Sequence, residues 1–170
     1  RTRITAEARF VRAVCHLGAV KMFAQPFGYT SDNSHLGIPL RLEASQNPLP
    51  RASVGEVYTA IIEDFTYAAE HLPSSNGAYA TSDAANGYLA HMHFLMQDWM
   101  KTVNYCDAII SSGHYSLDTD LNRFESGITN VETIFGIQSF MDSDLLEDAT
   151  FVDFRCESLR DNYRSDNNPT

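Results

Sequence analysis

The sequence is poor in cysteine, with three residues in a chain of 170: Cys15, Cys106 and Cys156. The number is odd and no Cys-x-x-Cys spacing occurs, so the sequence predicts neither a zinc site nor a disulfide framework. Cys15 and Cys106 fall in apolar stretches with helical spacing, where a free thiol packs as a small hydrophobic side chain. We therefore expect both to be buried free thiols.

Basic residues and long apolar runs are also scarce. The chain has 12 Lys and Arg against 22 Asp and Glu, which gives a formal net charge of −10. This charge argues against nucleic acid and against direct binding to an anionic membrane, because both need a basic surface. No run of 18 apolar residues occurs, so we expect no transmembrane helix. The chain begins in helical pattern without Met, and we interpret it as part of a longer protein whose targeting signals lie elsewhere.

The usual catalytic and metal-binding motifs are missing. The sequence has no phosphate-binding glycine loop, nucleophile elbow or His-Glu-x-x-His motif. His91 and His93 would point about 200° apart on a helix, so they cannot chelate one ion. An acidic stretch near the end lacks the glycine and final Glu of an EF-hand, and its members are Asp142, Asp144, Glu147 and Asp148. We therefore expect no enzyme activity, no cofactor and no metal, and only a helical glycosidase remains as a remote alternative.

Apolar residues instead recur every three or four positions, which predicts an all-α fold. A first helix is expected over residues 5–24, ended by Pro26. A second begins at a capping box formed by Ser53 and Glu56 and ends before Pro73. On this second helix, Glu63 and Asp64 are expected on a solvated face, opposite the apolar stripe.

Residues 82–117 predict a helical hairpin around which the chain is organised. The second helix of the hairpin is closed by Gly113, the residue type best able to adopt a left-handed conformation at a helix end. Its expected core-facing residues are Trp99, Val103, Cys106, Ile109 and Ile110. The hairpin fits the 34-residue tetratricopeptide pattern in part, with Leu89 and Ala90 at its Leu-Gly pair. An ordinary helical hairpin remains the alternative.

Residues 25–51 predict a long loop without regular structure, and loops of this length are often functional. Its aromatic and polar residues are able to combine ring stacking with hydrogen bonding, and the candidate ligand-binding residues are Phe27, Tyr29, Asn33 and His35. The alternative is a loop that folds back on itself, with Phe27, Leu36 and Ile38 as an apolar plug. Farther along, Ile134, Phe135 and Ile137 are β-branched or aromatic, which predicts a short strand over residues 134–137, whereas residues 141–170 predict an acidic, poorly ordered tail.

Several separate segments resemble the SusD/RagB family. They are AEARFVRA at residues 6–13, FAQPFGYTSDNSHLGIPL at 23–40, PRASVGEVYTAIIEDFTYAAEHLP at 50–73 and NVETIFGIQ at 130–138. The resemblance implies that residues 1–140 are the tetratricopeptide-like helical part of a longer SusD/RagB-type protein, with long loops and at most a short strand. It departs from the family pattern at Gln97, which replaces a turn glycine.

The resemblance also implies a function. Proteins of this family are outer-membrane lipoproteins of Bacteroidetes-type bacteria, lie on the extracellular face and bind oligosaccharides, or peptides in some members, for polysaccharide utilisation. They deliver these nutrients to a SusC-like, TonB-dependent transporter. The expected function is therefore non-enzymatic ligand binding, without nucleic acid. A tetratricopeptide adaptor that binds a partner protein in a helical groove is the alternative.

Overall fold

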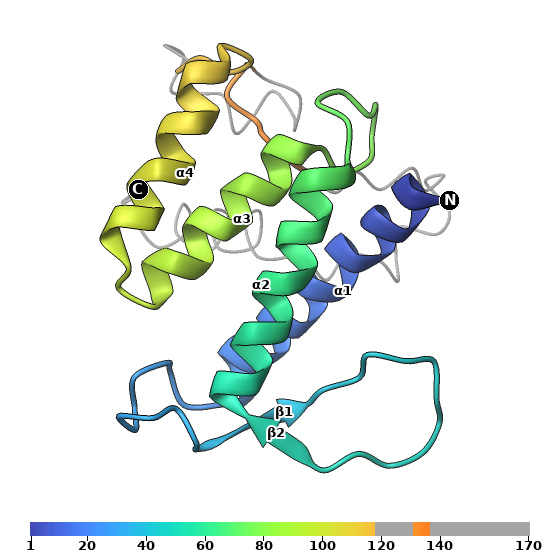
Figure 1. Ribbon diagram of the computed structural model, residues 1–170, viewed down its shortest axis with the longest axis vertical. Coiled ribbons are helices and arrows are strands. Elements are labelled where there is room, and N and C mark those ends of the chain that lie inside the picture. The colour runs from blue at the N-terminus through green and yellow to red at the C-terminus, as the bar shows by residue number, and fades with distance from the viewer. Residues whose placement is uncertain (118–130, 137–170) are drawn as a thin grey trace, which may run out of the picture. The chain divides into compact units, whose positions relative to one another are not determined.

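The computed structural model describes residues 1–117 and 131–136 (Figure 1). Within them lie α1 (Thr2–Phe23), α2 (Val54–His71), α3 (Ser82–Leu95) and α4 (Trp99–Ser112). Each helix packs against the next along the chain, which confirms the predicted all-α fold of tetratricopeptide-like hairpins. In the described part of the chain, no helix combines the length and apolar character needed to cross a membrane.

The helix ends follow local sequence signals. The Ser53 hydroxyl accepts a hydrogen bond from the Glu56 amide, and the Glu56 carboxylate accepts one from the Ser53 amide, so the predicted capping box is present. Between α3 and α4, Gln97 has a φ of 61°, which explains why a glycine suits this turn. Asp98 then caps α4, and Gly113 ends α4 with a φ of 68°.

The centre of the core is an aromatic cluster shared by three helices. Phe65 of α2 stacks on Tyr88 of α3 with ring centroids 4.9 Å apart. Phe10 of α1 meets both rings edge-on, at 5.6 and 5.4 Å. Phe10 and Phe65 are fully buried, so this cluster fixes how α1, α2 and α3 pack.

Asp64 corrects one expectation, because it is buried rather than solvated. It is 3% exposed and forms a two-pronged ion pair with Arg12 of α1, with both N–O distances at 2.7 Å. Arg12 also donates to the backbone oxygen of Leu42, so one side chain joins α1, α2 and the loop before β2. This hydrogen-bonded pair raises the pKa of Arg12. Glu63 is exposed, as expected.

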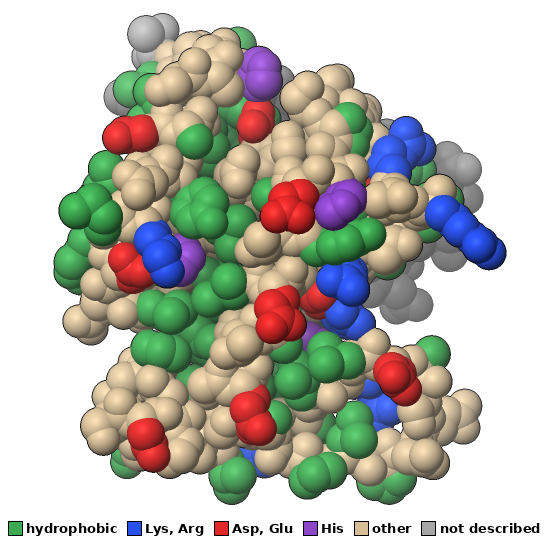
Figure 2. Space-filling model, viewed as in Figure 1, with side chains coloured by type: hydrophobic (Ala, Val, Ile, Leu, Met, Phe, Trp, Pro, Cys, Tyr) green, Lys and Arg blue, Asp and Glu red, His purple; other side chains and the backbone are tan. Residues whose placement is uncertain are grey.

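Two thiols and most of the apolar residues of α4 are exposed, although the sequence predicted that they are buried. Cys15 and Cys106 are exposed. On α4, Ile109 is buried, whereas Trp99, Val103 and Ile110 are 56%, 53% and 73% exposed. Their spacing places them in one stripe, and the described residues cover only the α3 side of α4. Figure 2 shows hydrophobic side chains gathered over the α3–α4 hairpin.

The strands lie where a loop was expected. β1 (Leu36–Pro39) and β2 (Arg51–Ser53) pair antiparallel, with Leu36 opposite Ser53 and Pro39 opposite Arg51. The prediction of a structureless loop over residues 25–51 is therefore wrong for β1. The strand expected at residues 134–137 is absent from described residues 134–136, which lie in a bend and irregular chain. The predicted tail at 141–170 and its acidic cluster lie outside the described residues.

Candidate functional site

The segment between α1 and α2 contains all four candidate ligand-binding residues and is held against the start of α2. The Val54 amide donates to the His35 oxygen at 2.9 Å, and the Gly55 amide donates to the Asn33 oxygen at 3.0 Å. In β1, a Cβ atom on Gly37 would lie only 3.0 Å from the Ala52 oxygen. This close approach requires glycine.

His35 holds this segment together through contacts of both its ring nitrogens. Its Nδ1 lies 2.9 Å from the Thr30 hydroxyl, and its Nε2 lies 3.3 Å from the Gln25 oxygen. A neutral imidazole protonated on Nε2 satisfies both contacts, since the hydroxyl donates to Nδ1 and Nε2 donates to the carbonyl. Both ring nitrogens are then used within the loop. The ring of His35 meets Tyr29 edge-on at 5.4 Å, so it positions that tyrosine.

Tyr29 presents its ring outward. Its side chain is 64% exposed, in contrast to Phe27. The Phe27 ring is half-buried, 4.9 Å from Tyr58 of α2, and packs against the core. Burial raises the pKa of Tyr58. Of the two candidate aromatic residues, Tyr29 is therefore the one available for stacking.

Asn33 serves the loop backbone through its oxygen. Its φ is 55°, and its Oδ1 accepts a hydrogen bond from the Gly28 amide at 2.5 Å. Its side-chain nitrogen makes no hydrogen bond to the described residues and remains a donor. Nearby, hydrogen bonds from Ser34 lower the pKa of Asp32, which keeps a carboxylate at the loop surface. The loop thus combines one exposed ring with an amide donor and a carboxylate acceptor.

The apolar plug considered as an alternative is present in part. Ile38 is buried and Phe27 is packed inward, whereas Leu36 is 61% exposed. The inward side of the segment is therefore structural, and its outward side carries Tyr29. The plug interpretation is thus confirmed for Phe27 and Ile38, whereas a ligand-binding role for the outward face stays a prediction.

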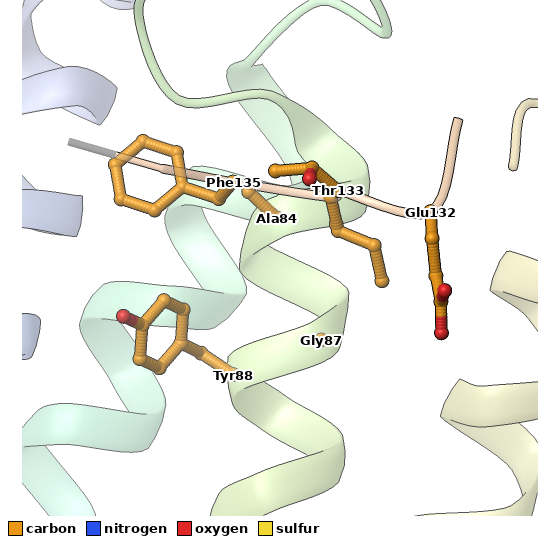
Figure 3. Close-up of a pocket in the computed structure, with 7 residues that line it drawn as sticks. Ala84, Gly87, Tyr88, Glu132, Thr133 and Phe135 are labelled. Carbon is orange, nitrogen blue, oxygen red and sulfur yellow. The ribbon is translucent and has the colours of Figure 1, made fainter. Parts of the chain in front are cut away.

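Several hollows in the described part of the chain contain none of the four candidate residues, and two of them bear on function. One, of about 350 Å³, lies beside α3 and is crossed by residues 132–135, as Figure 3 shows. There Ile134 and Phe135 pack on the core, and the Phe135 ring lies 5.1 Å from that of Phe10. The second, of about 650 Å³, lies between α1 and β1 and includes His16, Phe23 and Arg51. Sequence analysis missed these residues, because helical periodicity does not reveal which face of α1 lies beside the strand.

Metal chemistry has no support in the described residues. No group of three or more His, Cys, Asp or Glu gathers there to hold an ion. His93 is buried and stacks on Tyr105, and its Nδ1 lies 3.5 Å from Asp98. Burial, followed by the charge of Lys101, lowers the pKa of His93. These contacts make His93 a packing residue in the α3–α4 hairpin.

The packed helical hairpins and the loop held beside them define a helical scaffold of the tetratricopeptide-like class. No known family profile matches the chain. A curated relative, SusD-like protein P25 of Formosa agariphila, is 30% identical over 118 residues, which are 67% of this chain and 21% of the relative. The chain thus spans about a fifth of that relative.

Solved structures agree with this relationship. A SusD superfamily protein of Bacteroides thetaiotaomicron matches with a TM-score of 0.69 and 22% identity, over 80% of this chain and 31% of its own. A SusD-like protein of Bacteroides fragilis matches with a TM-score of 0.64 and 25% identity, over 85% of this chain and 29% of its own. A SusD-like carbohydrate-binding protein of Bacteroides vulgatus matches with a TM-score of 0.64 and 21% identity, over 80% of this chain and 30% of its own. The chain belongs to the SusD superfamily.

Proposed function

We propose that this chain forms part of a non-enzymatic binding protein for oligosaccharides. Its helices act as a scaffold, and the outward face of the segment between α1 and α2 contacts the ligand. The observation that carries the proposal is the exposed Tyr29 ring, held edge-on by His35, whose own ring nitrogens contact Thr30 and Gln25. A rigid, exposed aromatic ring provides a flat apolar surface for the C–H face of a sugar.

The four candidate residues have different roles in this proposal. Tyr29 stacks on the sugar, and the Asn33 side-chain nitrogen donates to a hydroxyl. His35 positions Tyr29 through its contacts with Thr30 and Gln25. Phe27 anchors the loop on Tyr58. This division follows from exposure and from the hydrogen bonds that are already made.

The place of action is a further part of the proposal and rests on membership of the SusD superfamily. We place the whole protein on the extracellular face of the outer membrane, attached by a lipid anchor. Its partner there is a SusC-like, TonB-dependent transporter, which receives the oligosaccharide. The net charge of −10 fits a carbohydrate ligand better than nucleic acid or an anionic membrane.

A binding screen tests the proposed ligand class. The full-length protein would be titrated with neutral and acidic oligosaccharides and with a set of peptides, with binding measured by calorimetry. We expect saturable binding of at least one oligosaccharide class. Binding of peptides alone would overturn the carbohydrate assignment, and turnover of any glycan would overturn the non-enzymatic one.

The α4 stripe favours a second candidate, a protein-binding adaptor, because Trp99, Val103 and Ile110 form an apolar face that the described part of the chain leaves exposed. The hollow beside α3 favours it less, since residues 132–135 line it (Figure 3) and Phe135 packs on Phe10. Substitution of Val103 by Asp separates the two candidates. We expect it to leave oligosaccharide binding unchanged, whereas an adaptor would lose its partner and bind no sugar.

A further inference from the structure

The hollow between α1 and β1 is a distinct surface, and neither Tyr29 nor Asn33 lines it. Its volume is about 650 Å³, within the range of pockets for small ligands. One wall comes from successive turns of α1 through Cys15, Ala19 and Phe23. The other comes from β1 and from Arg51 at the start of β2.

Arg51 gives this hollow its charge. Its Nε donates to the Gly37 oxygen at 2.6 Å, and its Nη2 donates to the oxygens of Phe23 and Leu36 at 3.0 and 3.1 Å. These bonds fix the guanidinium between the end of α1 and β1, and they leave Nη1 without a hydrogen bond to the described residues. The lining includes no Asp or Glu. A fixed guanidinium with a spare donor is suited to a carboxylate.

His16 adds a neutral donor. Burial lowers the pKa of His16, and the positive charge of Arg12 lowers it further, so the ring is uncharged at neutral pH. Its Nδ1 is buried and has no hydrogen-bond partner among the described residues. A buried N–H without an acceptor is costly, so the proton belongs on Nε2. The more accessible edge of the ring then carries an N–H group that is able to donate to a hydroxyl oxygen.

Phe23 supplies an apolar surface. It ends α1, its side chain is 68% exposed, and its backbone oxygen is held by Arg51. An exposed phenylalanine beside a fixed cation and a neutral donor combines the three features that recognise a sugar carrying an acid group. Small anions lack the C–H face that the ring would contact.

We propose that this hollow is a subsite for a uronate unit of an oligosaccharide. The uronate carboxylate accepts from Arg51 Nη1, a ring hydroxyl accepts from His16 Nε2, and the C–H face of the sugar lies on Phe23. The inference rests on the proposed function, because it names the charge class of that protein's ligand. It assigns the acid unit to a surface separate from Tyr29.

Cys15 allows a direct test, because it is exposed and lines the hollow, whereas Cys106 is exposed on α4 and provides an internal control. The full-length protein would be alkylated with iodoacetamide in the presence of tetragalacturonate or tetramannuronate, with cellotetraose and mannotetraose as neutral counterparts. Peptide mass spectrometry would give the rate at each thiol. We expect an acidic tetrasaccharide to slow alkylation of Cys15 at least threefold and to leave Cys106 unchanged.

The variants separate this inference from the proposed function. Phe23→Ala should abolish the protection of Cys15, whereas Phe94→Ala, which changes an exposed phenylalanine of α3, should preserve it. Acetate at the same carboxylate concentration should give no protection. If oligosaccharides bind in a Tyr29-dependent manner but leave Cys15 reactive, the subsite is wrong and the proposed function stands. Equal protection by neutral sugars overturns the uronate assignment, and binding of no oligosaccharide overturns both proposals.

Discussion

The α1–α2 pair and the segment that joins the two helices use their side chains in opposite ways. In the pair, Phe10, Phe65 and Asp64 are turned inward and satisfied by partners on the other helix or on α3. In the joining segment, hydrogen bonds between His35, Thr30 and Gln25 close the loop on itself, and Tyr29 remains outside. The first arrangement provides stability, whereas the second provides a rigid surface. Substitutions in the two regions should therefore have separable effects.

The largest effect on stability is expected from Asp64→Ala. It leaves Arg12 without its carboxylate partner, and loss of one member of a buried pair costs about 3–5 kcal/mol. The Arg12 side chain is 29% exposed, so we expect the lower end, about 3 kcal/mol. Urea denaturation measures this change. Glu63→Ala alters the neighbouring exposed acid and should change the free energy of unfolding by less than about 0.5 kcal/mol. Equal effects of the two substitutions would show that Asp64 is not a scaffold residue.

A smaller loss is expected from Ser53→Ala, at the boundary between the two regions. It removes the hydroxyl that accepts from the Glu56 amide, and loss of such a cap costs about 1 kcal/mol. Ser82→Ala is the matched control, because Ser82 is the first residue of α3 and the cap there is Thr81. Urea denaturation should show little change for Ser82→Ala. A Ser53→Ala variant as stable as wild type would mean that β2, rather than the cap, fixes the start of α2.

The scaffold should also weaken in mild acid. Burial lowers the pKa values of His16, His91 and His93, so the unfolded chain binds these protons more readily than the folded one. Their contribution is complete above an unfolded pKa of about 6.5 and is lost as pH falls below it. We expect the melting temperature to fall by a few degrees from pH 7 to pH 5. His93→Phe should flatten this slope, and an unchanged slope would assign the effect to other groups.

Local signals predicted the helices well. The capping box at Ser53, the break before Pro73 and the left-handed Gly113 act through contacts within a few residues, so they are readable from sequence. The length and composition of residues 25–51 indicated the candidate loop and its four candidate residues. The rings of Tyr29 and His35 meet in the structure, and the role of both residues in binding stays a prediction.

Long-range contacts were not predictable in the same way. Asp64 looked solvated because nothing local indicates that Arg12, 52 positions away, meets it from another helix. Cys15 and the α4 stripe were predicted to be buried because they lie in apolar stretches with helical spacing. Cys15 is nevertheless exposed on α1, and the described residues cover only one side of α4. The strand β1 was missed because its partner, β2, is only three residues long and follows a gap of 11 residues. The hollow beside Arg51 depends on this same pairing.

The most direct test of the division between scaffold and binding surface pairs two exposed tyrosines, Tyr29 and Tyr79, which are 64% and 67% exposed. Each would be replaced by alanine in the full-length protein, and both the melting temperature and the dissociation constant for the oligosaccharide found in the screen would be measured. We predict that Tyr29→Ala weakens binding by about tenfold, the loss of one stacking contact, with the melting temperature unchanged. Tyr79→Ala should change neither quantity. A Tyr29→Ala protein that melts several degrees lower but binds normally would contradict the account and make the loop part of the scaffold.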